Sequence, residues 1–246
     1  MFHIFESSKT IQMNKTISLL AVTALLFGTA TSCKKKGCTD SNAVNYSTEA
    51  KKDDGTCKYG PTITVNGNNP ETISVGSIYS DAGATATNKD GTAATVTSTN
   101  NIDVNTAGTY TVTYTATNDN GSATATRTVN VVIGMDNWVV DWEVTSDCGT
   151  TFPLDALPVI TEGTSANALV IDNMFNTVGG TAYATINGNN ITIPTQTIDF
   201  TFAQVTFSGI GTINDQANTI TITYTYDNTT PIIGGNGTCV ATYTKL

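Results

Sequence analysis

Histidine and arginine are nearly absent from this chain of 246 residues, and their scarcity excludes several kinds of active site. The only histidine is His3, and the only arginine is Arg127. Catalytic triads that use His, and metal centres with His ligands, therefore cannot be assembled from the rest of the chain. We predict a protein that is not an enzyme and that needs no cofactor.

Positive charge is also scarce. The chain has 11 Lys and Arg against 20 Asp and Glu, which gives a formal net charge of -9. Such an acidic surface excludes nucleic acid as a partner. Leucine is rare after residue 33, where Thr, Asn, Gly and Val dominate instead. This composition has little material for helices and predicts an all-β protein.

The N-terminal segment has the layout of an export signal. Met13 begins a stretch with one basic residue, Lys15, an apolar run over Ile17–Phe27, and then small residues. The run is too short for a membrane span, and we predict a signal peptide over residues 1–32. Met13 is an alternative start, because the residues before it add no recognisable basic region.

Cys33 follows these small residues and precedes three lysines, Lys34–Lys36. This pattern resembles bacterial lipoprotein signal peptides, although Ala30 stands where a Leu is usual. The resemblance implies that Cys33 is acylated, that the lipid bilayer is a partner, and that the protein is an outer-membrane lipoprotein on the periplasmic face or the cell surface. The alternative is an ordinary cleaved signal peptide and a soluble product.

The chain has five cysteines, and an odd number in an exported protein requires an explanation. If Cys33 carries lipid, the other four can pair within separate regions, Cys38 with Cys57 and Cys148 with Cys239. A zinc site is not expected, because there is no C-x-x-C pair and no nearby His.

Residues 33–60 form a predicted lipid-anchored linker. Gly37–Tyr59 resembles a short Cys-flanked repeat of exported bacterial proteins, and its size requires a disulfide. Asp40, Asp53 and Asp54 are candidate calcium ligands. The alternative is that these carboxylates are merely solvated, because their spacing differs from that of an EF-hand loop.

Residues 61–133 have the pattern of a β-sandwich. Thr109–Ala116 alternates strictly, and turn signals recur at Asn66–Gly67, Asp90–Gly91 and Asn120–Gly121. Four segments resemble the bacterial Ig-like domain typified by the pesticidal crystal protein: 61–67, 75–84, 105–110 and 114–121. The resemblance implies a spacer or adhesive module.

Residues 134–246 are predicted to form a small antiparallel β-barrel of about eight strands. Trp138–Val144 alternates as an opening strand, and hairpins are expected at Asn187–Gly188 and Asp215–Asn218. A β-bulge is expected between Phe202 and Val205. A disulfide from Cys239 to Cys148 would join the last strand to the first and close the barrel.

This region is similar to lipocalin-like, or calycin-like, domains of bacterial lipoproteins, on the Trp-bearing first strand, Val170–Asn173, Ile186–Pro194, Phe207–Gly211 and the closing Cys239–Tyr243 segment. The resemblance implies a barrel that holds one small ligand or is filled by its own side chains. Five aromatic residues are candidates for the ligand site: Trp138, Trp142, Phe202, Tyr224 and Tyr226. The alternative is that they only form the core.

The functional expectation is an anchored, non-catalytic lipoprotein that displays a barrel on an Ig-like spacer and binds a glycan or a small apolar molecule. The alternative is a structural or adhesive surface protein without a ligand pocket. The sequence carries no indication of the oligomeric state.

Overall fold

A computed structural model describes residues 34–176, 178–201 and 203–246. It separates into two compact units, Met1–Tyr59 and Gly60–Leu246. Cys33 and the predicted signal peptide lie outside the described residues, so the predictions of cleavage and acylation remain predictions. Within the described part of the chain, no helix is both long enough and apolar enough to cross a bilayer.

In the first unit, a disulfide joins Cys38 to Cys57. It closes a short loop and stabilises the folded state by about 3 kcal/mol in the chain-entropy picture. The unit has no regular strand among its described residues and consists of turns, bends and irregular segments with two isolated β-bridges. The disulfide therefore compensates for a core that so short a segment cannot build.

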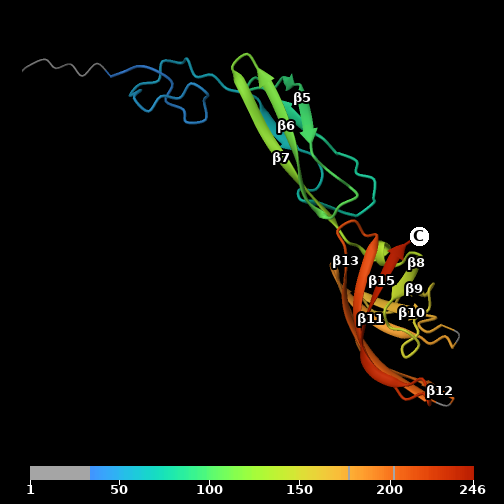
Figure 1. Cartoon of the computed structure of the whole chain (residues 1–246). Coiled ribbons are helices and arrows are strands. Elements are labelled where there is room, and N and C mark those ends of the chain that lie inside the picture. Colours follow the sequence, from blue (N-terminus) through green and yellow to red (C-terminus); the bar gives the residue numbers. More distant parts are fainter. Residues whose placement is uncertain (1–33, 177, 202) are drawn as a thin grey trace, which may run out of the picture. The chain divides into compact units, whose positions relative to one another are not determined.

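The second unit begins with two sheets that make up the Ig-like domain (Figure 1). The larger sheet has the order β2-β7-β6-β5, with β2 parallel to β7 and the other pairs antiparallel. Its strands are β2 (Glu71–Ser74), β5 (Val96–Asn100), β6 (Gly108–Asn118) and β7 (Gly121–Val132). The smaller sheet, ordered β1-β3-β4, consists of β1 (Thr62–Val65), β3 (Ala84–Thr87) and β4 (Ala93–Ala94).

The predicted inward face of β6 is confirmed. Val112, Tyr114 and Ala116 are buried, and Tyr110 is partly buried against the same cluster. Residues from both sheets pack on this face, as expected of a sandwich. Alternation on β6 therefore identifies the core, because successive side chains of a strand point to opposite faces.

Arg127 on β7 is fully buried, at a position where alternation places an inward side chain. Its Nη1 lies 3.0 Å from an Asp81 carboxylate oxygen and 3.2 Å from one of Glu71, and the two carboxylate side chains are 25% and 26% exposed. Nη2 donates to the carbonyl oxygen of Asn66. Tyr114 donates its hydroxyl to Asp81 at 2.5 Å. The only arginine of the chain thus ties together segments that are distant in sequence.

Asp81 makes the stability of this domain depend on pH. Burial by itself would raise the pKa of the carboxyl, but hydrogen bonds from Tyr114 and the Gly83 N–H, together with the Arg127 charge, lower it below the ordinary 3.8. A carboxyl whose pKa is lower in the folded state stabilises that state above its unfolded-state pKa. This contribution is lost as the pH falls through the folded-state pKa.

We therefore expect Asp81→Asn to lower the free energy of unfolding clearly at pH 7 and less at pH 3, where the wild type has lost part of the same contribution. Urea denaturation at the two pH values measures the difference. Asp119→Asn, in the exposed turn between β6 and β7, is the matched control and should change either value by less than about 0.5 kcal/mol. A deficit equally large at both pH values would contradict the expectation.

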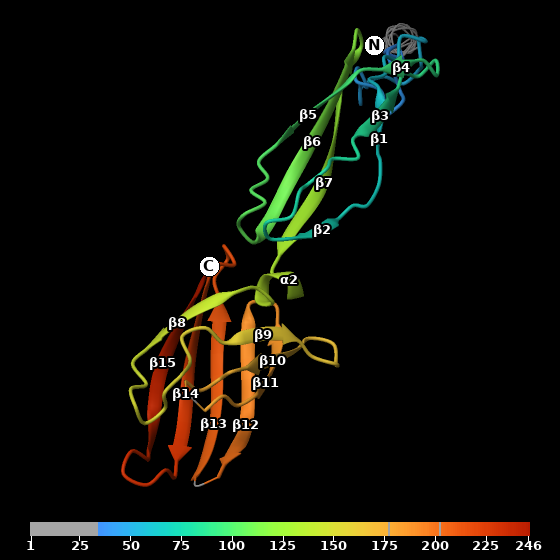
Figure 2. The same ribbon diagram turned by 90° about the vertical axis from the view of Figure 1, so that its right-hand side faces the viewer.

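The C-terminal region is one eight-stranded antiparallel sheet that curls into a half-barrel (Figure 2). The order is β8-β15-β14-β13-β12-β11-β10-β9, so that each strand from β9 to β15 pairs with the next in sequence. The strands are β8 (Trp142–Ser146), β9 (Val159–Glu162), β10 (Ala168–Asp172), β11 (Ala182–Asn187), β12 (Asn190–Phe200), β13 (Ala203–Ile213), β14 (Thr219–Asn228) and β15 (Gly235–Lys245). The all-β prediction and the two expected hairpins, β11–β12 and β13–β14, are confirmed.

The strands β8 and β15, which are first and last in sequence, are neighbours in the sheet, as predicted. The disulfide Cys148–Cys239 lies beside their ladder. Full closure of the barrel is not observed. A closed barrel would also pair β8 with β9, but within the described residues those two strands are the edges of the sheet. Instead, the Val144 N–H donates to the Ala156 carbonyl at 2.8 Å, and the connection that contains Ala156 bonds to the segment after β10 through Asp155 N–H to Met174 carbonyl, at 3.1 Å, and Asn176 N–H to Pro153 carbonyl, at 2.9 Å. Residues 147–158 occupy the place of the missing ladder.

Two local predictions were wrong. Trp138 does not open a strand: it ends the short helix α2 (Met135–Trp138), in which the Asn137 side chain accepts a hydrogen bond from the Gly134 N–H at 3.0 Å. The strand pattern holds only from Trp142 onward. The register irregularity lies between Ile193 and Gln196, near Pro194. It does not lie between Phe202 and Val205, because Ala203–Val205 pair in regular register with Ile198–Phe200. Proline disrupts a ladder because it has no N–H to donate.

Candidate functional site

The aromatic residues proposed from the sequence as ligand contacts lie in the core of the half-barrel. Trp138, Trp142 and Tyr224 are at most 1% exposed. Tyr226 is partly buried and stacks on Phe152, with 4.8 Å between ring centroids and 9° between ring planes. Phe202 lies outside the described residues. The four described aromatics therefore fill the curled sheet, which is the alternative that the sequence left open.

A pair of tyrosines supplies the polar contact of this core. The hydroxyls of Tyr224 and Tyr243 lie 2.6 Å apart and are fully buried. Burial raises the pKa of Tyr243 to about 12 and that of Tyr224 well above its ordinary value. Both hydroxyls stay protonated at neutral pH, and one of them donates its proton to the other in a single hydrogen bond.

Phe152 plugs the open side of the half-barrel. Its ring is fully buried and contacts the rings of Phe175, Phe207 and Tyr224 at centroid distances of 5.1, 5.6 and 5.4 Å. Phe152 lies in the connection between β8 and β9, residues 147–158. The disulfide of Cys148 holds this connection before Phe152, and the Asn228 side chain also holds it by donating to the Thr151 carbonyl at 2.7 Å. The segment that replaces the β8–β9 ladder thus carries its own core residue.

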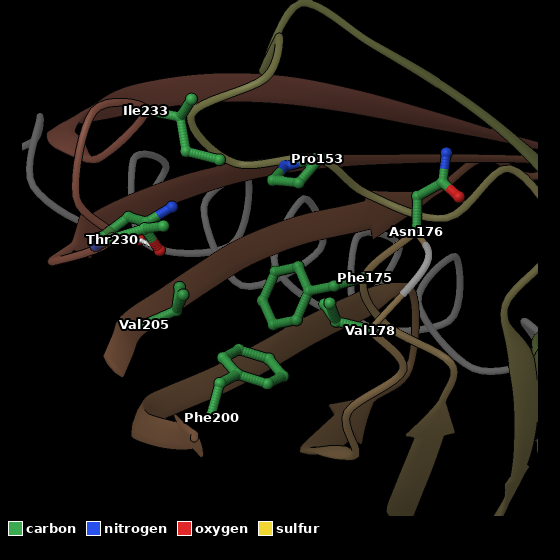
Figure 3. A pocket seen from close by; sticks show the side chains of 9 residues that line it. Pro153, Phe175, Asn176, Val178, Phe200, Val205, Thr230 and Ile233 are labelled. Carbon is green, nitrogen blue, oxygen red and sulfur yellow. Dashed lines mark hydrogen bonds between the residues drawn. The ribbon is translucent and has the colours of Figure 1, made fainter. Parts of the chain in front are cut away.

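An apolar pocket of about 160 Å³ lies at one end of the sheet, beside this plug (Figure 3). We call it the mouth pocket. The β12–β13 hairpin, the β14–β15 connection, the 173–180 loop and the Phe152 segment contribute its walls. Its lining residues are Pro153, Phe175, Asn176, Val178, Phe200, Val205, Asn228, Thr230 and Ile233. Figure 3 shows the rings of Phe175 and Phe200 and the side chain of Val205 on its floor.

The chemistry of the mouth pocket suits a small uncharged group. No lining residue carries a charge, and the polar members are two amides and one hydroxyl. Asn228 is already engaged, since its side chain donates to Thr151 and accepts from the Thr230 N–H at 2.9 Å. An apolar cavity of about 150 Å³ holds a benzene molecule. The pocket therefore has room for one aromatic ring or a short branched alkyl group.

The rim of the mouth pocket exposes apolar side chains. Val178 is 51% exposed, Ile233 is 50% exposed, and Ile232 projects fully into solvent. Ile232 also has a φ of 78°, which is strained for a β-branched residue. Apolar side chains held outward around an apolar pocket mark a contact surface, because burying them there gains hydrophobic free energy.

Sequence reasoning missed this pocket, whose walls combine strand ends with turns and loops. A signal was present in Thr229–Gly235, where the pair Ile232–Ile233 interrupts a segment of Thr, Pro and Gly. Two adjacent isoleucines in a turn cannot both belong to an alternating strand face. Their presence there indicates a contact surface or a local pocket.

The calcium candidates of the first unit are engaged in local turns. Asp53 accepts the Gly55 N–H at 3.1 Å, and Asp54 accepts the N–H and the hydroxyl of Thr56 at 3.1 and 2.6 Å. Asp40 accepts the Asn42 N–H and the Tyr59 hydroxyl. Among the described residues, the three carboxylates do not gather into one ligand cluster. The one cluster of possible metal ligands among all described residues is Asp147 with Cys148 and Cys239 in the C-terminal region. Its two cysteines form a disulfide and offer no thiolate.

Comparison with known proteins identifies one part of the chain. Residues 63–131 match the family described as "Bacterial surface protein, Ig-like domain". No curated protein matches the sequence. Among solved structures, the lipoprotein BT2262 from Bacteroides thetaiotaomicron is 18% identical; the alignment covers 75% of this chain and 100% of that one, with a TM-score of 0.29. The narrower likenesses to the pesticidal crystal protein and to lipocalins remain resemblances. Residues 63–131 are thus similar to a bacterial surface Ig-like domain, and they are followed in this chain by a curled eight-stranded sheet.

Proposed function

We propose that this protein is a membrane-anchored, non-catalytic lipoprotein of the bacterial envelope that binds a small apolar group in the mouth pocket of its half-barrel. The observation that carries the proposal is the uncharged pocket itself, walled by Phe175, Phe200 and Val205 and rimmed by exposed isoleucines. The Ig-like domain serves as the spacer between anchor and binding domain.

Two further observations support the parts of this proposal. Cys33 follows a signal-like segment, and two disulfides account for the four other cysteines, as expected of an exported chain with one acylated Cys. Against catalysis, the mouth pocket contains no carboxylate, amine, imidazole or thiol. Its lining therefore has no group with the usual pKa of a general acid or base.

We expect toluene to bind the full chain and Ile233→Asp to weaken that binding by about tenfold or more. The substitution replaces an apolar wall with a charge that toluene cannot pair, and losing even part of one buried isoleucine contact costs about 1.4 kcal/mol. Ligand-observed NMR titration measures the dissociation constant. Because Ile233 is half exposed, the variant should fold normally.

Ile210→Asp is the matched control, since Ile210 is 68% exposed on β13 and does not line the pocket. It should leave toluene binding unchanged. If the wild type binds neither toluene nor indole at millimolar concentration, the pocket proposal is wrong. The remaining function would then be that of a structural or adhesive surface protein.

A further inference from the structure

A second concavity lies beside the β9–β10 hairpin and shares no lining residue with the mouth pocket. It measures about 370 Å³, within the range of roughly 300–1,000 Å³ typical of small-molecule sites. The hairpin extends beyond the sheet next to β11 (Figure 2). We call this concavity the hairpin groove; its lining residues are Glu162, Gly163, Thr164, Ser165, Ala168, Leu169, Val170, Tyr183, Ala184, Thr185 and Pro194.

An exposed aromatic ring forms one wall of the hairpin groove. Tyr183 is 60% exposed, although most large aromatic residues of this region are buried. It is paired with Val170 on β10, and both side chains lie on the outer side of the sheet, opposite to Leu169 and Ala184. Pro194 on β12 adds a second flat apolar surface. We call the two apolar surfaces of Tyr183 and Pro194 together the platform.

The backbone that carries this platform is held in place by a side chain. Gln196 accepts the Tyr183 N–H at 3.0 Å and donates to the Tyr183 carbonyl at 2.9 Å and to that of Pro194 at 3.3 Å. The Gln196 amide thus replaces the main-chain partner that β12 fails to supply to Tyr183, because the β11–β12 ladder ends at the pair Thr185–Thr192 and Pro194 has no N–H to donate. A platform fixed before binding costs less conformational entropy when a ligand arrives.

The opposite wall of the hairpin groove is polar and contains no cation. Thr164, Ser165 and Thr185 provide hydroxyls, and Glu162 provides the only charge among the lining residues. A carboxylate accepts hydrogen bonds from ligand hydroxyls and makes them stronger than neutral ones. The same carboxylate repels anions. The lining therefore favours a neutral ligand rich in hydroxyl groups that also has an apolar face.

We propose that the hairpin groove binds a neutral saccharide, whose ring stacks on Tyr183 while its hydroxyls donate to Glu162 and pair with the neighbouring threonine and serine hydroxyls. Sugar rings combine an apolar face with a polar edge, which matches the two walls. This site is separate from the mouth pocket and does not depend on a ligand there.

The test is isothermal titration calorimetry of the full chain with cellohexaose and maltohexaose as neutral probes and an oligogalacturonate of equal length as the anionic probe. We expect at least one neutral probe to bind and the anionic probe to bind more weakly. Tyr183→Ala should weaken binding by about tenfold or more, whereas Tyr183→Phe should retain most of it, because stacking needs the ring and not the hydroxyl. Glu162→Gln should weaken neutral binding and reduce the discrimination against the anion.

Two matched controls separate this site from others. Tyr46→Ala removes a tyrosine of similar exposure outside the groove and should leave saccharide binding unchanged. Ile233→Asp should also leave it unchanged, while Tyr183→Ala should leave toluene binding unchanged. The proposal is overturned if neither neutral hexasaccharide binds at millimolar concentration, or if binding survives Tyr183→Ala intact.

Discussion

Replacing Arg127 with methionine is expected to destabilise the Ig-like domain by about 3–5 kcal/mol. The guanidinium is fully buried, and its removal leaves Asp81 and Glu71 without their cationic partner and the Asn66 carbonyl without its donor. Breaking a buried ion pair from one side costs about this much, because the remaining charge has no compensation. Urea denaturation of the full chain measures the change in the free energy of unfolding.

Lys89→Met provides the matched control for this substitution. Lys89 also lies in the Ig-like domain, but it is exposed, and its replacement should change the unfolding free energy by less than about 0.5 kcal/mol. The triple variant Arg127→Met, Asp81→Asn, Glu71→Gln should recover part of the loss, since it leaves no charge unpaired. A loss below about 1 kcal/mol for Arg127→Met alone would show that the network contributes little.

The Phe152 plug leads to the second large effect. Phe152→Ala is expected to cost about 3–5 kcal/mol, because it removes a fully buried ring and leaves a cavity among Phe175, Phe207, Tyr224 and Tyr226. The new cavity would be lined by aromatic rings and should bind benzene. Thermal denaturation with and without benzene should therefore show a larger stabilisation of the variant than of the wild type.

Leu157→Ala is the control for the plug, because Leu157 lies in the same connection but is 57% exposed. Its effect should remain below about 1 kcal/mol. If Phe152→Ala and Leu157→Ala destabilise the protein equally, the connection between β8 and β9 is not a plug. Phe152 would then be a peripheral contact.

Strand periodicity allowed much of the fold to be predicted, with identifiable limits. The β6 face and the hairpins at Asn187–Gly188 and Asp215–Asn218 are correct, since alternation and turn chemistry depend on residues close in sequence. The helix at Trp138 was missed because its residues also fit an alternating strand pattern. The register shift was misplaced because alternation does not reveal where a partner strand loses its ladder at Pro194.

The candidate sites were less predictable than the fold. Trp138, Trp142 and Tyr224 were candidates because aromatics often contact ligands, but curling of the sheet buries Trp142 and Tyr224, and helix α2 places Trp138 in the same core. The mouth pocket combines residues from strand ends and loops that are separated by up to 80 positions, and the hairpin groove depends on the Gln196 side chain replacing a backbone partner. Apart from the Ile232–Ile233 pair, neither arrangement has a local sequence signature.

By itself, the sequence determined the all-β class and the inward face of β6, because these follow from composition and local alternation. It predicted the pairs Cys38–Cys57 and Cys148–Cys239, which the structure contains, on the condition that Cys33 carries lipid. The tertiary structure decided that the barrel stays open between β8 and β9, that Phe152 fills the opening, and that Arg127 is buried among carboxylates. These features depend on which distant segments meet in space, and only packing of the whole domain sets that.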